Sequence, residues 1–271
     1  IKACDAVIDA GVYQLEDDYF TNFKIQNEVS RENIFVIPFD AVHYPGFSLS
    51  AMTLHYASQE TFDLSFQPWN GFCAVEEFYN SFDENDDRIE SFIVGPQFES
   101  DGVTPLLDGS AGDPDGEPIN FTPHINSLDD AYRQDGARVS KFEIGRSISN
   151  PEATGMDNDF PIFRYADVLL MKAEALYRFI PDNQEDLILV NQIRNRANIE
   201  PLTELTAEII LAERGREFFC EAWRRTDLIR FGKYNDAWWE KPADPSDHVN
   251  IFPIPQGALN DNFNLRQNPG Y

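Results

Sequence analysis

The sequence of 271 residues predicts a mainly α-helical protein with antiparallel helix pairs, long ordered loops and minor β-structure. Two consecutive segments within residues 164–197 carry apolar residues at helical spacing. Residues 101–160 contain 12 of the 32 glycines and prolines, which favours an irregular chain there. The clearest β-rich run is short, at residues 34–37, so strands contribute little to the predicted fold.

The first forty residues predict three short elements. Small and apolar residues lie on one side of residues 2–10, and Gly11 follows them, which predicts a helix closed by a left-handed glycine. Aromatic residues in a mixed pattern over residues 17–29 predict short helices and loops. Ile34–Ile37 is ended by Pro38 and predicts a buried strand.

The middle of the chain predicts one helix and one strand within irregular segments. Apolar residues at positions i, i+3, i+4 and i+7 predict an amphipathic helix over residues 74–82. A strand is expected at Arg138–Ile144, inside the long irregular segment of residues 101–160. Loops of that length are uncommon unless they are functional or disordered.

The last hundred residues predict a helical framework. Helices are expected over residues 164–179 and 186–197, followed by a helix over residues 207–219. Aromatic and charged residues then fail to follow one stripe, so we expect a second short helix after a break near Ala222. Residues 232–271 are rich in Asn and Pro and are predicted to cover the framework.

Charge divides the chain into two parts of one predicted domain over residues 1–271. The net charge is −26. Residues 1–160 hold 30 acidic and 8 basic residues, whereas residues 161–271 hold 17 and 13. We therefore expect residues 1–160 to form a loop-rich acidic part that faces ligand, and residues 161–271 to form the framework and its C-terminal cover. The negative charge argues against nucleic acid as a partner.

Dense charges among large aromatics in Glu213–Phe231 predict ion pairs that are partly buried. Burying such charges without partners would be costly, so they are expected to pair with one another. A catalytic pair of carboxylates is the less favoured alternative. The residues predicted to form structural ion pairs are Arg164, Asp167, Glu174, Glu213, Glu217, Arg224, Asp227 and Arg230.

No catalytic or metal motif is visible in the sequence. The four histidines are scattered, and there is no nucleophile elbow, phosphate-binding loop or dinucleotide fingerprint. The three cysteines lack metal spacing and are expected to be free thiols. We predict no cofactor and no metal site, with structural calcium left open at the acidic turns Asp83–Asp87 and Asp113–Gly116.

An aromatic and polar stretch is the best candidate for ligand binding. Sugar rings present apolar C–H faces that stack on Trp or Tyr, and their hydroxyls need polar side chains around them. Such residues gather without helical periodicity between residues 43 and 72. Trp69 is the first choice for a stacking platform, and its alternative role is to pack a corner before the next helix. The predicted ligand-binding residues are Trp69, His55, Tyr56, Tyr44, Gln59, Asn70 and Trp239.

Several ordered blocks of the sequence form a recognisable set: Arg164–Leu176, Asn191–Ala197, Glu213–Phe231, Ile251–Pro255 and Gln267–Tyr271, with weaker matches at Ala6–Leu15, Trp69–Gly71, Phe78–Asp83 and Asp87–Arg88. In this order they resemble the SusD/RagB family of Bacteroidetes outer-membrane nutrient-binding proteins. The resemblance covers nearly the whole chain but only the C-terminal half of a usual member. The chain also opens inside a predicted helix without Met, so we expect the N-terminal helical-repeat portion to be missing.

The resemblance implies a SusD-like fold with tetratricopeptide-like helix pairs and a role without catalysis. It implies oligosaccharide or polysaccharide binding at the bacterial surface and delivery to a SusC-like TonB-dependent transporter. It also implies a surface-exposed lipoprotein of the outer membrane, with signal and anchor outside this chain. RagB-like peptide binding, a glycoside hydrolase and a purely structural lid remain alternatives. The matched blocks belong to the framework, so the resemblance assigns no ligand residue.

Overall fold

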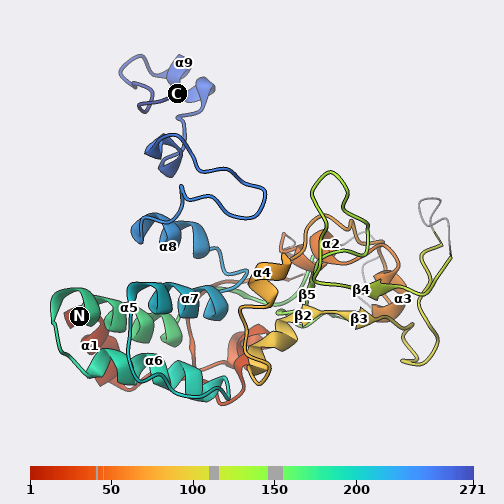
Figure 1. Cartoon of the computed structure of the whole chain (residues 1–271), viewed down its shortest axis with the longest axis horizontal. Helices are drawn as coiled ribbons and strands as arrows, with labels where there is room; N and C mark the ends of the chain where they lie inside the picture. The colour runs from red at the N-terminus through yellow and green to blue at the C-terminus, as the bar shows by residue number, and fades with distance from the viewer. Residues whose placement is uncertain (41, 45, 110–115, 146–154) are drawn as a thin grey trace. The chain divides into compact units, whose positions relative to one another are not determined.

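The computed structural model describes residues 1–40, 42–44, 46–109, 116–145 and 155–271 (Figure 1). Contacts divide the chain into two compact units, unit 1 over Ile1–Glu221 and unit 2 over Ala222–Tyr271. This division differs from the charge-based division at residue 160, because the acidic part and most of the helical framework pack into the same unit. Helices predominate and strands are short, as the sequence predicts.

Helix α5 (Tyr165–Phe179) is the centre of the helical part of unit 1. It packs against α6 (Glu185–Arg196), α7 (Ala207–Glu217) and α1 (Lys2–Ala10) (Figure 1). The α5 face toward these neighbours is apolar and fully buried, including Leu169, Leu170 and Ala173. These helices lie within one residue or two of the predicted ranges, and Gly11 closes α1 in the left-handed conformation.

Strands β1 (Asn33–Ile37) and β6 (Phe160–Arg164) form an antiparallel pair that leads into α5. The pairing register runs from Asn33 opposite Arg164 to Ile37 opposite Phe160, with irregularities around Phe35. The β1 strand was predicted to be buried, and that prediction is wrong, because among the described residues only β6 pairs with it. Phe35 is 58% exposed.

The rest of unit 1 is built from short elements joined by ordered loops. Its helical turns are η1 (Tyr19–Phe23), η2 (Asn27–Val29), α2 (Leu49–Thr53), α3 (Ser58–Phe62), α4 (Glu76–Tyr79) and η3 (Asp87–Ser91). Its strand pairs are β2 (Phe92–Ile93) with β5 (Arg138–Val139), and β3 (Gly95–Pro96) with β4 (Asn120–Phe121).

Two predicted elements in this part are shorter than expected. The helix predicted over residues 74–82 contracts to α4, because Ala74 exchanges both backbone hydrogen bonds with Ala137 and residues 80–83 turn inward to bury Phe82. The strand predicted over 138–144 contracts to β5, because Lys141 and Phe142 turn into the core.

Unit 2 contains α8 (Arg224–Arg230), η4 (Asp247–Asn250) and α9 (Gln256–Asp261), joined by extended chain. The predicted break between α7 and α8 is present, with Cys220 and Ala222 in the left-handed region at φ 60° and 65°. All of residues 222–271 are described, and none of their apolar side chains is buried. Among the described residues of the whole chain, no helix has the length and apolar character that crossing a membrane requires.

Candidate functional site

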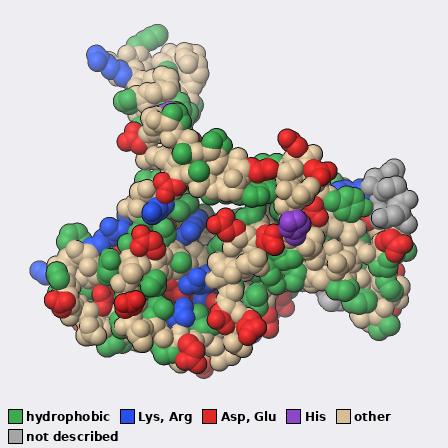
Figure 2. All heavy atoms as spheres, in the orientation of Figure 1, with side chains coloured by type: hydrophobic (Ala, Val, Ile, Leu, Met, Phe, Trp, Pro, Cys, Tyr) green, Lys and Arg blue, Asp and Glu red, His purple; other side chains and the backbone are tan. Residues whose placement is uncertain are grey.

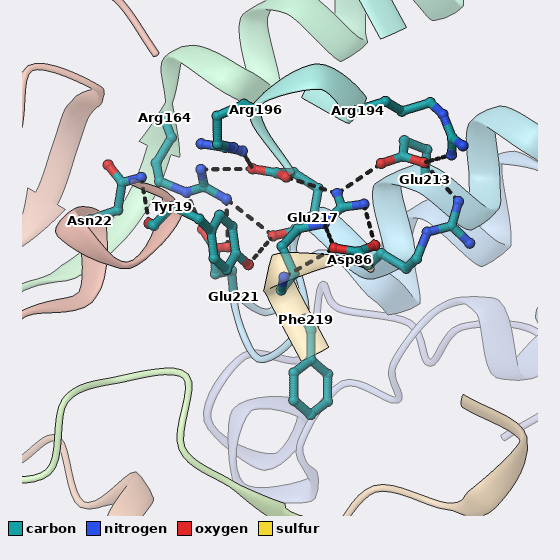
Figure 3. A network of polar contacts seen from close by, with 12 residues as sticks. Tyr19, Asn22, Asp86, Arg164, Arg194, Arg196, Glu213, Glu217, Phe219 and Glu221 are labelled. Atoms are coloured by element: carbon teal, nitrogen blue, oxygen red, sulfur yellow. Dashed lines mark hydrogen bonds and ion pairs between the residues drawn. The ribbon is translucent and has the colours of Figure 1, made fainter. Parts of the chain in front are cut away.

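A buried network of ion pairs fixes the helical framework to the loops around it (Figure 3). Arg164 pairs with Glu32, Glu217 and Glu221, and all four side chains are almost completely inaccessible. Arg88, from η3, pairs with Asp86, with Glu213 at 2.7 Å and with Glu217 at 3.1 Å. The network therefore joins the residue before β1 to β6, η3, α7 and the turn after α7. Within unit 1, most Lys and Arg side chains visible in Figure 2 lie over α5 to α7.

Neighbouring arginines keep two buried acids of this network, Glu213 and Glu217, ionised. Burial alone would raise the pKa of the Glu213 carboxyl, but the charges of Arg88 and Arg216 outweigh burial and lower the pKa to about 2. The pKa of Glu217 is also lowered, because Arg196, Arg164 and Arg88 surround it in opposition to burial. Burial lowers the pKa of Lys141 to about 8, although Glu221 lies 2.5 Å from its Nζ.

The other residues predicted to form ion pairs lie outside this network. Asp167 pairs with Arg214 at 2.9 Å inside the helix cluster. Glu174 pairs with Arg178 one turn later in α5. In unit 2, the buried Asp227 pairs with Arg230 at 2.8 Å, and Arg224 is an exposed residue at the start of α8.

Trp69 lies on a loop whose backbone is anchored to α2. The amides of Trp69 and Asn70 donate to the carbonyls of Ala51 and Leu54 at 2.7 and 3.0 Å, and Gly71 and Phe72 both donate to Met52. Carbonyls at the end of a helix have no partner within the helix, so the loop satisfies them. Asn70 adopts φ 51°, which turns the chain and leaves the Trp69 ring 49% exposed.

A pocket of about 410 Å³ lies between α3 and the chain that follows β3. Thr61 joins its two sides by donating a hydrogen bond of 2.7 Å to the carbonyl of Phe98. Leu106, Ile119 and Phe121 form a small core beneath it. Its polar lining provides both hydrogen-bond donors and acceptors. The lining residues are Tyr56, Ala57, Gln59, Glu60, Gln67, Glu99, Leu106, Leu107, Asp108 and Gly109.

A buried polar chain connects the pocket with the Trp69 loop. Asp108, whose side chain is 2% exposed, lies 2.7 Å from Arg133 and 3.5 Å from Nε2 of His55. The backbone carbonyl of Arg133 accepts a hydrogen bond of 3.1 Å from Asn70. Burial lowers the pKa of His55 to about 4 despite the neighbouring Asp108, so its ring is neutral at pH 7.

The pocket brings together only part of the predicted ligand-binding set. Tyr56 and Gln59 line it, and Trp69 and Asn70 belong to the loop that Arg133 connects to it. His55 has no exposed surface, so our expectation of a direct ligand contact is corrected: its Nδ1 accepts from the Ala57 amide behind the pocket wall. Tyr44 is 73% exposed in a separate turn with Asp40, and Trp239 belongs to unit 2 at 39% exposure.

Eight of the ten lining residues were absent from the predicted set, namely Ala57, Glu60, Gln67, Glu99, Leu106, Leu107, Asp108 and Gly109. Glu60 carried a weak signal, because it follows Gln59 in the aromatic and polar stretch. The sequence around Asp108 carried no such signal. Asp108 reaches the pocket through the pairing of Leu107 with Pro118 and of Leu106 with Ile119, which are distant in the sequence.

The described residues contain no group of three or more His, Cys, Asp or Glu side chains placed to hold a metal ion. In the acidic turn Asp83–Asp87, both carboxylate oxygens of Asp86 accept hydrogen bonds from Arg88. Most of the second candidate turn, Asp113–Gly116, lies outside the described residues. Structural calcium stays an untested prediction.

Comparison with known proteins gives consistent matches in sequence and in fold. The model of the SusD family matches residues 75–271. The starch-binding protein SusD of Bacteroides thetaiotaomicron is 35% identical over 148 residues, which are 51% of this chain and 26% of that protein. The SusD-like protein P38 of Formosa agariphila is 33% identical over 156 residues, covering 51% of this chain and 29% of that protein.

A solved structure of surface glycan-binding protein A from Bacteroides thetaiotaomicron, in complex with laminarihexaose, shares the fold. Its TM-score is 0.74 at 26% identity, and the match covers 98% of this chain and 58% of that chain. A structure of the same protein described without a ligand gives TM-score 0.74 at 25% identity. The matches thus cover somewhat more than half of these two structures, and less than a third of the two curated relatives named above.

Proposed function

The chain belongs to the SusD family, and from this premise we propose that it binds oligosaccharide or polysaccharide at the bacterial cell surface without catalysing a reaction on it. The proposal includes delivery of the glycan to a SusC-like TonB-dependent transporter and a place on the outer membrane as a surface-exposed lipoprotein. The SusD-like relatives and the laminarihexaose complex of surface glycan-binding protein A support it.

The observation that carries the proposal is the pocket beside the Trp69 loop. Tyr56, Gln59 and Gln67 offer hydroxyl and amide groups that can both donate and accept, as sugar hydroxyls require. The exposed Trp69 ring lies two residues beyond Gln67 and offers a flat apolar face for stacking. Four backbone hydrogen bonds to residues 51–54 hold the Trp69 loop in place, so little order would have to be gained there on binding.

Isothermal titration calorimetry against a panel of glycans and peptides tests the proposal. Laminarihexaose is the first probe, followed by starch, xylan, pectin and mannan fragments, and by mixed peptides as the opposing arm. We expect saturable heat with at least one glycan and none with peptides. Binding of peptides alone would favour the RagB-like alternative and reject the proposal.

A product assay separates binding from hydrolysis. The pocket contains the carboxyl groups of Glu60, Glu99 and Asp108, and glycoside hydrolases use a pair of such groups. We expect a fluorescently labelled oligosaccharide that binds in calorimetry to remain intact over a day with the protein in excess. Release of shorter labelled products, abolished by Glu60→Gln or Glu99→Gln, would assign the hydrolase alternative instead.

A further inference from the structure

We propose that the pocket selects uncharged glycans and discriminates against acidic ones, an inference that rests on the proposed function and concerns the same site. Three of its ten lining residues are acidic, namely Glu60, Glu99 and Asp108, and none of these ten described residues is Lys or Arg. Side chains of Asp and Glu carry negative charge at neutral pH. A ligand carboxylate or sulfate placed here would meet like charge inside a concave surface.

The three carboxylates differ in their surroundings: the charge of one is balanced by a neighbouring arginine, and the other two are accessible in the pocket lining. Asp108 is buried and lies 2.7 Å from Arg133, so its charge is balanced locally. Glu60 is exposed and Glu99 is partly exposed, so both can meet an incoming ligand. The hydrogen bond from Thr61 to the Phe98 carbonyl holds the two segments together at the residues next to Glu60 and Glu99. Glu60 and Glu99 therefore come from two segments of the pocket lining that are held to each other.

Neutral and acidic ligands would interact differently with the two glutamates. A neutral sugar hydroxyl can donate to a glutamate carboxylate, which makes a charge-assisted hydrogen bond. A sugar carboxylate has no proton to donate at neutral pH, and it loses solvation while approaching like charge. Juxtaposed like charges are a recognised source of specificity at interfaces. The acidic surface of residues 1–160 adds long-range repulsion of the same sign.

A matched pair of ligands tests the proposal directly. The neutral ligand is the glycan that binds best in the panel, with laminarihexaose as the first probe. The acidic ligand is the same oligosaccharide after its primary hydroxyls have been oxidised to carboxylates, which keeps chain length and linkage. We expect the acidic form to bind at least about tenfold more weakly in about 20 mM NaCl, and the gap to shrink in about 500 mM NaCl, because salt screens exposed charges.

The variant Glu60→Gln/Glu99→Gln removes the two open charges and keeps the size of both side chains, while each amide replaces one acceptor oxygen with an NH2 donor. We expect the ratio of neutral to acidic affinity to fall at least about fivefold in this variant at low salt. The control Glu84→Gln/Glu204→Gln makes the same change in net charge at exposed residues outside the pocket lining. We expect the control to leave the ratio close to that of the wild type. Circular dichroism verifies that both variants fold.

The outcomes distinguish this inference from the proposed function. Equal or tighter binding of the oxidised glycan, or a best panel ligand that is acidic, would overturn the inference while leaving glycan binding in place. An equal fall of the ratio in the control would assign selectivity to overall charge and reject the role of the pocket. Absence of binding by every glycan would remove the proposed function and this inference with it.

Discussion

At the scale of single residues, Trp69 is exposed because its backbone is engaged elsewhere. Four backbone amides of its loop donate hydrogen bonds to carbonyls at the end of α2 and of Leu54, which follows it. The ring is therefore held outward and does not pack into the core. We expect Trp69→Ala to weaken binding of the best glycan by about 1–3 kcal/mol, since an exposed aromatic at the centre of a contact contributes about that much.

Calorimetry with the same glycan measures the loss, and Phe35→Ala serves as the control because this exposed ring lies on β1, outside the pocket lining. Unfolding in urea should be nearly unchanged for Trp69→Ala, because the ring is half exposed. Unchanged affinity would mean that Trp69 only packs the corner after α2.

The buried acids of the network make stability depend on pH. The folded pKa of Glu213 is about 2, below its value of 4.5 in an unstructured chain, because Arg88 and Arg216 outweigh the effect of burial. A carboxyl whose pKa is lowered by folding stabilises the protein above the unfolded pKa, and this contribution is lost as pH falls through the folded pKa. We expect the free energy of unfolding to decline between about pH 4.5 and pH 2, by roughly 3 kcal/mol for this group alone.

Urea unfolding at a series of pH values measures this decline. Glu213→Gln should flatten it and also lower stability at neutral pH by about 3–5 kcal/mol, because the partner arginines stay buried. Glu208→Gln, at an exposed position of the same helix, should leave the slope intact. If the unfolding free energy falls equally steeply with pH in Glu213→Gln and in the wild type, Glu213 is not the source of the pH dependence.

At the scale of elements, sequence patterns predicted the helices whose formation depends on neighbouring residues. They failed for elements whose length is set by contacts with residues far away in the sequence. Helices α5, α6 and α7 were predicted nearly to their ends, because their apolar periodicity reflects local geometry. The helix around Phe78 was predicted too long, because Ala74 pairs with Ala137 and that partner is invisible in the local pattern. The same limit hid the place of Asp108 in the pocket lining, whereas local composition pointed to the segment from which Tyr56 and Gln59 line the pocket.

The close approach of Cys73 to Gly136 shows how the pairing of Ala74 with Ala137 becomes possible. Gly136 adopts φ +83°, and a Cβ built there would lie 2.0 Å from the Cys73 sulfur. The glycine therefore lets the chain before β5 approach Ala74 closely, and the same segment supplies Arg133, which pairs with Asp108 behind the pocket lining. We expect Gly136→Ala to destabilise the protein by about 2–4 kcal/mol, from left-handed strain and overpacking together.

A double-mutant cycle separates the two causes. Cys73→Ala removes the colliding sulfur, so we expect Gly136→Ala to cost about 1–2 kcal/mol less in that background. Urea unfolding at neutral pH gives the four free energies. Equal costs in both backgrounds would show that the sulfur has no part in the loss, which backbone strain and the contacts with Cβ of residue 73 and with Ile125 would then account for.

At the scale of the whole molecule, the two units differ in how their backbone hydrogen bonds are protected. Unit 1 has buried apolar clusters and the ion-pair network, whereas Asp227 is the single buried residue among residues 222–271, all of which are described. Aromatic residues of unit 2 stay on its surface, with Phe252 70% and Phe263 94% exposed. Segments with few buried apolar contacts open at low free energy and exchange their amides early.

Hydrogen–deuterium exchange of the 271-residue chain, read by mass spectrometry, measures this difference. We expect peptides from residues 165–217 to be protected by at least about a hundredfold more than peptides from residues 222–271, because opening α5 to α7 exposes their shared apolar core. The helix α8 is the internal control, since its Asp227–Arg230 pair should slow exchange only slightly. Protection of residues 251–271 equal to that of α5 would mean that unit 2 is stabilised by more than the contacts within it.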